Sequence, residues 1–155
     1  SALAERLART SAIRVREAVD GAMVESDCVY LAPGGTNTTV VGAAGAARFA
    51  LAVPLAAGAA VPSADVLFRS AAGVFGAHAI AVVLTGMGRD GTEGVRAIRG
   101  AGGRAIVQDR DSSAIYGMPR AALAEAGADA VISLDGMASA IVMAIAEEPR
   151  AWQTA

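Results

Sequence analysis

Apolar residues in the second half of the chain follow two patterns, which alternate along the sequence. Short apolar runs without polar alternation, typical of buried parallel strands, occupy residues 79–85, 104–108 and 130–133. Apolar positions recur at helical spacing over residues 92–100, 119–126 and 136–147. Strands that alternate with helices in this way predict a parallel sheet that is covered by helices on both faces.

The first half of the chain has shorter patterns. It predicts a short amphipathic helix over residues 3–10 and strands over residues 15–18 and 28–31. Residues 38–41 and 48–53 flank "GAAGAA", which is typical of a β-hairpin, and a helix is expected to follow Pro62-Ser63. Because we find no internal repeat and no linker, we expect one α/β domain over residues 1–155.

Composition narrows the classes of function. The chain is 54% hydrophobic but only 4% aromatic, so its core must be built from Ala, Val, Leu and Ile. All thirteen cations are arginines, they are scattered, and the net charge is −2, which argues against nucleic-acid binding. The single cysteine, Cys28, excludes an internal disulfide, and nothing indicates a metal site. The most apolar long stretch, residues 43–61, carries Arg48 and Pro54, so we expect no membrane insertion and a cytoplasmic protein.

A glycine-rich loop, "LTGMGRDGTEG" at residues 84–94, lies between a predicted strand and a predicted helix. Its G-x-G-x-x-G spacing, with Asp109 about twenty residues further on, matches a dinucleotide-binding motif. However, Asp90 would place a negative charge where the pyrophosphate should bind. The alternative is a carboxylate site, in which Asp90 either orients a catalytic histidine or only caps the helix. The spacing alone leaves these two roles open.

Longer stretches resemble the catalytic domain of the chemotaxis protein-glutamate methylesterases, the CheB family. They are "DVLFRSAA" at 65–72, "VVLTGMGRDGTEGVRAI" at 82–98 and "GGRAIVQDRDSSAIYGMPRAAL" at 102–123. "VYLAPGG" at 29–35 and "ALAERL" at 2–7 fall in register with the same family. The resemblance covers nearly the whole chain. It implies a doubly wound, mostly parallel, Rossmann-like sheet with helices on both faces and a β-hairpin insertion.

The resemblance also implies an activity. The family hydrolyses glutamyl methyl esters, and can deamidate glutamines, on the cytoplasmic helices of methyl-accepting chemoreceptors, with a Ser-His-Asp triad and no cofactor. A regulatory receiver domain can lie upstream. By motif match, Asp90 is the triad acid, and Met87 supplies a backbone N–H to the oxyanion hole. Residues expected in the loops at the cleft are Gly86, Gly88, Gly91, Tyr116, Gly117, Met118 and Pro119.

The nucleophile and the base of that triad have no match in this chain. In the family both precede the "ALAERL" helix, at which this chain begins, so we expect an N-terminally incomplete domain that is inactive alone. The only histidine, His78, falls at a position that varies in the family and is expected at a surface or helix end. Ser112 and Ser113 are expected to form a turn rather than to act as nucleophiles.

Two further departures favour an alternative, a degenerate scaffold or binding module of the same fold. Thr36-Asn37-Thr38 stands where the family commonly has a histidine. Residues 56–60, all Ala and Gly, stand where it commonly carries a basic run. Substrate recognition is therefore the feature that these changes would affect.

Overall fold

The computed structural model describes residues 1–54 and 60–147, and its contacts divide the chain into two compact units, Ser1–Ser63 and Ala64–Ala155. The alanine-rich segment predicted to replace a basic run lies largely outside the described residues. The single domain over residues 1–155 stays a prediction.

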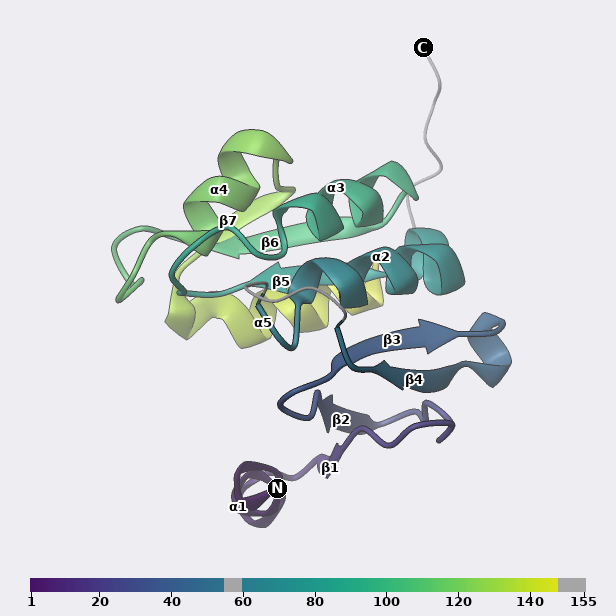
Figure 1. Ribbon diagram of the computed structural model, residues 1–155. Helices are drawn as coiled ribbons and strands as arrows, with labels where there is room; N and C mark the ends of the chain where they lie inside the picture. Colours follow the sequence, from purple (N-terminus) through teal and green to yellow (C-terminus); the bar gives the residue numbers. More distant parts are fainter. Residues whose placement is uncertain (55–59, 148–155) are drawn as a thin grey trace. The chain divides into compact units, whose positions relative to one another are not determined.

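A three-stranded parallel sheet forms the centre of the second unit, in the order β5-β6-β7. The strands are β5 (Ile80–Val83), β6 (Arg104–Gln108) and β7 (Ala130–Ile132). The helices are α2 (Ala64–Phe75), α3 (Thr92–Gly100), α4 (Met118–Glu125) and α5 (Leu134–Ala146). Figure 1 shows α3 and α4 on one side of this sheet and α5 on the other. The predicted parallel pairing, with helices on both faces, is confirmed here.

Alternation along β6 explains this layering. Ala105 and Val107 are fully buried in one apolar cluster together with Val95 and Ile98 of α3. Ile106 lies between them in sequence and is 3% exposed. Because successive strand residues point to opposite faces, Ile106 faces the side that α5 covers. A strand buried on both faces needs a continuous apolar run, which is the pattern that residues 104–108 carry.

The first unit contains α1 (Ala2–Thr10) and two pairs of strands. Strands β1 (Arg14–Glu17) and β2 (Cys28–Leu31) are parallel. Strands β3 (Asn37–Val41) and β4 (Arg48–Ala52) form the predicted antiparallel hairpin. Counting both units, the described strands form three separate sheets rather than one.

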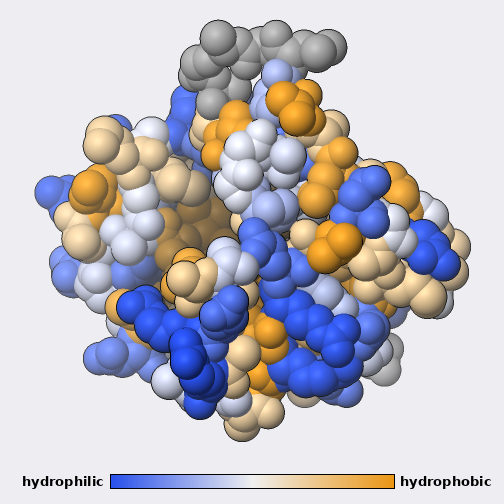
Figure 2. Space-filling model, turned by 60° about the horizontal axis from the view of Figure 1, so that its bottom comes forward, coloured by the Kyte–Doolittle hydropathy of each residue, from blue (hydrophilic) through white to orange (hydrophobic). Residues whose placement is uncertain are grey.

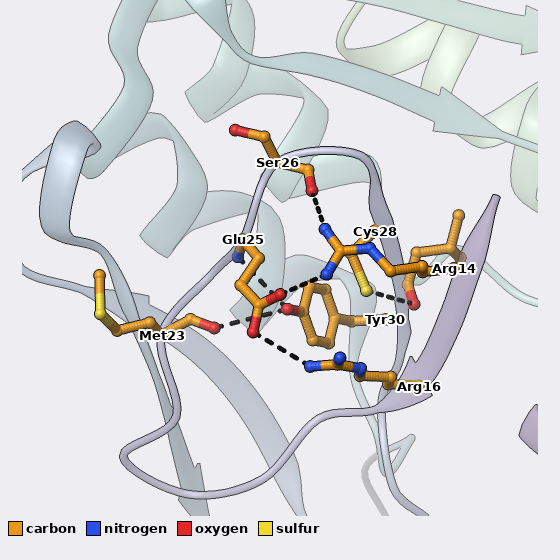
Figure 3. Close-up of polar contacts among 8 residues, drawn as sticks. Arg14, Arg16, Met23, Glu25, Ser26, Cys28 and Tyr30 are labelled. Carbon is orange, nitrogen blue, oxygen red and sulfur yellow. Dashed lines mark hydrogen bonds and ion pairs between the residues drawn. The ribbon is translucent and has the colours of Figure 1, made fainter.

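Charged and aromatic side chains brace the first unit (Figure 3). Arg14 and Arg16 both donate to the Glu25 carboxylate, at 2.6 and 3.0 Å, and Arg14 holds the pKa of Glu25 below its ordinary value. The Glu25 N–H donates to the Tyr30 hydroxyl at 3.3 Å, and the Tyr30 ring lies 4.7 Å from that of Phe49. These contacts connect the β1-β2 pair to the hairpin, so we assign the cluster a structural role.

The predicted element boundaries differ from the observed ones at a few ends. The helix at residues 92–100 and the strand at residues 104–108 have the predicted bounds. The strand predicted over residues 79–85 is shorter, Ile80–Val83. It ends early because the Thr85 N–H donates to the side chain of Gln108 at 2.7 Å, where a longer strand would use a backbone carbonyl.

Candidate functional site

Asp90 lies in the loop between β5 and α3, and its carboxylate accepts hydrogen bonds from three backbone N–H groups. Oδ2 accepts from Ala64 at 2.7 Å, and Oδ1 accepts from Asp65 and Gly91 at 3.0 Å each. Ala64 and Asp65 are the first two residues of α2, and their N–H groups have no acceptor within that helix. Asp90 therefore places its negative charge at the N-terminus of α2, where the helix dipole favours it.

A second carboxylate, on α2, makes the reciprocal contact with α3. Asp65 accepts a hydrogen bond from the Gly94 N–H of α3 at 2.7 Å. The acid that precedes α3 thus caps α2, and an acid of α2 satisfies an N–H in the first turn of α3. Of the two carboxylate roles that the spacing left open, the structure shows a capping role, but toward α2 rather than toward α3. No role for Asp65 was predicted from the sequence, although an acid in the first turn of a helix is a signal that could have found it.

Met87 lies on the same loop and is 80% exposed. In the part of the chain that the structure describes, its backbone N–H has no hydrogen-bond acceptor. The neighbouring Gly88 and Gly91 both have φ of +92°, and Gly91 is the N-cap of α3. Left-handed conformations on both sides of Asp90 allow the loop to turn sharply from the strand into the helix.

The second predicted loop lies beside the first. Tyr116 pairs with Gly86 in an isolated parallel bridge, and the N–H groups of Gly117 and Met118 both donate to the Gly86 carbonyl, at 3.2 and 2.8 Å. A side chain at Gly117 would place Cβ only 2.7 Å from that carbonyl oxygen, so the two loops can approach only because residue 117 is glycine. Pro119 is buried at the start of α4. The structure thus brings together the residues of both predicted loops.

Asp109 and the serines that follow it form a turn, as predicted. Asp109 Oδ1 accepts from the Ser112 hydroxyl at 2.6 Å and from its N–H at 2.9 Å, which lowers the pKa of Asp109. The Ser113 hydroxyl donates to the Asp109 carbonyl at 2.6 Å. The nucleotide-binding interpretation loses support here, because Asp109 binds this turn and the Gly91 N–H donates to Asp90.

His78 is exposed at the end of a short 3₁₀ helix, Gly76–His78, as predicted. It lines a cavity of about 310 Å³ together with Arg104 and the C-terminal end of α5. This cavity lies at the amino ends of β5 and β6, whereas Asp90 follows the carboxyl end of β5. Active sites of open α/β sheets gather at the carboxyl ends, so the Asp90 loop rather than this cavity is the candidate site.

About half of the arginines among residues 1–54 and 60–147 form ion pairs. Six arginines form ion pairs with carboxylates: Arg14, Arg16, Arg89, Arg96, Arg99 and Arg104. On the face drawn in Figure 2, hydrophilic residues gather in several clusters with hydrophobic residues between them. Over residues 1–54 and 60–147, no three His, Cys, Asp or Glu side chains lie where they could hold a metal ion. Nor does this part of the chain contain a helix long and apolar enough to cross a membrane.

Comparisons with known proteins identify relatives of this chain. The family model described as CheB methylesterase matches residues 1–141. The chain is 43% identical to a protein-glutamate methylesterase/protein-glutamine glutaminase of Anaeromyxobacter dehalogenans and 44% identical to one of Caulobacter vibrioides, over 91% and 92% of its length. It spans 41% of the length of each of these relatives.

A solved structure matches as well. The crystal structure of the Thermotoga maritima CheB methylesterase catalytic domain superposes with a TM-score of 0.86 at 33% identity, over 92% of this chain and 75% of that one. The predicted α/β fold and the resemblance on which the site residues rest are therefore confirmed.

Proposed function

Because the chain belongs to the CheB methylesterase family, we propose that it supplies the acid and one oxyanion-binding N–H of a serine esterase site. The acid is Asp90 and the N–H is that of Met87. The nucleophilic serine and the histidine base come from polypeptide outside these 155 residues. The chain by itself is therefore an inactive part of a hydrolase that acts on carboxylic esters.

The observation that carries this proposal is the way in which Asp90 is held. A triad acid must stay ionised and keep the imidazole in one tautomer and orientation. Asp90 is half-buried, and three backbone N–H groups hold its two oxygens in place. A carboxylate fixed in this way loses little entropy when it orients a histidine, because its position is set before the histidine arrives.

Met87 supports the second part of the proposal. Oxyanion holes use backbone N–H groups that are aimed at the reacting centre and are not consumed by the fold. The Met87 N–H has no acceptor within the described residues, although the neighbouring Gly86 N–H donates to Ile115 at 3.0 Å. Ester and amide hydrolysis both pass through a tetrahedral oxyanion, so one donor serves both reactions.

The substrate follows from the relatives, whose names state both protein-glutamate methylesterase and protein-glutamine glutaminase. We propose glutamyl methyl esters and glutamines on the cytoplasmic helices of methyl-accepting chemoreceptors, and hence action in the cytoplasm. An upstream receiver domain would regulate access to the site.

Methanol release from methylated receptor, catalysed by the protein that contains this chain, tests the proposal. Asp90→Asn should lower kcat about 10⁴-fold, as loss of the acid does in serine enzymes. Asp135→Asn is the matched control, because Asp135 is an exposed acid in the first turn of α5. The 155-residue chain should release no methanol. Turnover by this chain alone, or full activity of Asp90→Asn, would contradict the proposal.

One observation favours the degenerate scaffold as a second candidate. Asn37, which replaces the histidine common in the family, accepts a hydrogen bond from the Ser63 N–H at 2.9 Å. Its side chain therefore makes a structural contact within the first unit. On this alternative the longer protein binds receptor but releases no methanol, even when its serine and histidine are present.

A further inference from the structure

Gln108, the last residue of β6, is a fully buried polar side chain, 0% exposed. Its Oε1 accepts from the Thr85 N–H at 2.7 Å, and its Nε2 donates to the Ser112 carbonyl at 2.8 Å and hydroxyl at 3.2 Å. The Thr85 N–H can only donate and the Ser112 carbonyl can only accept, so these partners determine which end of the amide is oxygen. Position 108 needs a side chain with one acceptor and two donors. An amide supplies these groups, and an apolar side chain does not.

The network extends from Gln108 to a third segment. The Ser112 hydroxyl accepts from Gln108 and from the Leu134 N–H, at 2.9 Å, and donates to Asp109. It thus uses its one donor and both acceptor sites. Through Gln108, the end of β5, the loop after β6 and the first turn of α5 are joined in one hydrogen-bonded unit. Buried networks in which every member is satisfied hold a single geometry.

Thr85 connects this unit to the loop that carries Met87, because it stands two residues before Met87. Its hydroxyl donates to the Ile115 carbonyl at 3.1 Å and accepts from the Ile115 N–H at 2.9 Å. The next residue, Gly86, donates to the same carbonyl and accepts from Gly117 and Met118. The backbone is therefore held on both sides up to Gly86. Met87 is an exposed residue, and its N–H has no acceptor within the described chain.

We infer that Gln108 is the positioning residue for the Met87 N–H. The inference rests on the proposed function, in which that N–H binds the oxyanion. Gln108 touches no reacting atom. It fixes the Thr85 peptide, and the Thr85-Gly86 backbone then sets the direction in which the Met87 N–H points. Without the amide, the Thr85 N–H and the Ser112 carbonyl must reach water, which displaces the loop that carries Met87.

The test replaces Gln108 by Met, which keeps the length of the side chain and removes its polar atoms. In the protein that contains this chain, Gln108→Met should lower kcat about 100-fold, because a displacement of about 1 Å at a catalytic group costs that much. KM should stay within about twofold, since the N–H binds the transition state rather than the ester. Ile98→Ala is the control. It truncates a buried residue in the last turn of α3, whose carbonyl accepts from the Gly103 N–H at 2.9 Å just before β6. Its kcat should stay within about twofold of the wild type at a temperature where it is folded.

A second measurement does not depend on catalysis. In the 155-residue chain, amide hydrogen exchange at Thr85 should accelerate at least about tenfold in Gln108→Met, while the Val95 amide in the core of α3 keeps its rate. If Gln108→Met does not fold, Gln108→Asn carries the same test, because the shorter side chain cannot reach both Thr85 and Ser112.

The outcomes separate the two proposals. A wild-type protein without esterase activity refutes the proposed function, and the Thr85 amide still tests the role of Gln108 in holding the loop. A wild-type kcat in Gln108→Met, a loss no greater than that of Ile98→Ala, an effect on KM alone, or an unchanged exchange rate at Thr85 would each overturn the inference.

Discussion

Replacing Asp90 by Ala should lower the free energy of unfolding of the 155-residue chain, whether or not the chain catalyses a reaction. The truncation removes the acceptor of three backbone N–H groups, two of which belong to the first turn of α2. If Asp90 served only catalysis, the chain would lose no stability when it is removed. Its position at a helix N-terminus predicts the opposite.

The magnitude follows from the geometry. A hydrogen bond to a charged group contributes about 1.5–3 kcal/mol, but the first N–H groups of a helix can bind water once their cap is removed. Loss of an N-cap side chain costs about 0.5–2 kcal/mol, and here a third N–H, that of Gly91, loses its acceptor as well. We therefore expect a loss of about 2 kcal/mol for Asp90→Ala. Asp90→Asn keeps one carbonyl oxygen and should lose about 1 kcal/mol.

Urea denaturation followed by circular dichroism measures these differences, with an unchanged m value as the check that only the native state is affected. In a chain of this length, 2 kcal/mol should lower Tm by about 4–8 °C. Asp135→Ala is the matched control, since Asp135 is an exposed acid in the first turn of α5 and should contribute only its interaction with the helix dipole, about 0.5 kcal/mol. An Asp90→Ala chain no less stable than Asp135→Ala would refute the capping role.

Three further predictions follow from contacts described above. Gly94→Ala should lose about 2–3 kcal/mol in urea denaturation, because the new Cβ would lie 2.5 Å from Cβ of Phe68 in α2; an unchanged midpoint would contradict the tight α2–α3 contact. Gly117→Ala, whose Cβ would lie 2.7 Å from the Gly86 carbonyl oxygen, should shift the amide resonances of the loop that carries Met87, and an unaltered spectrum would count against the close approach of the two loops. Because the Ser112 hydroxyl and N–H lower the pKa of Asp109, their contribution to stability is present above the ordinary pKa of about 3.9 and is lost as the pH falls through the lower folded value. Ser112→Ala should therefore raise the pKa of Asp109 in an NMR titration, and no change would show that the hydroxyl is not its partner.

Several elements could be predicted from sequence because their causes are local. The helix at residues 92–100 and the strand at residues 104–108 were placed correctly, since Gly102-Gly103 separates a helical apolar period from a continuous apolar run. The two loops at residues 86–91 and 116–119 were predicted through motifs rather than through physics alone. Gln108 was part of such a motif, yet its pattern showed only a polar residue at the end of a strand. Its burial depends on the loop that folds over it.

By itself, the sequence determined the order of the elements, the parallel pairing of the second half, the family and the loop that carries Asp90. These follow from periodicity, glycine placement and motif spacing, which are properties of neighbouring residues. Only the tertiary structure decided what Asp90 and Gln108 contact. Two of the N–H groups that hold Asp90 lie 25 and 26 residues earlier in the chain, and Gln108 joins residues 23 positions before it and 4 after it. Such partners are selected by packing α2 on α3 and β5 on β6, because only a folded backbone brings distant donors and acceptors within 3 Å.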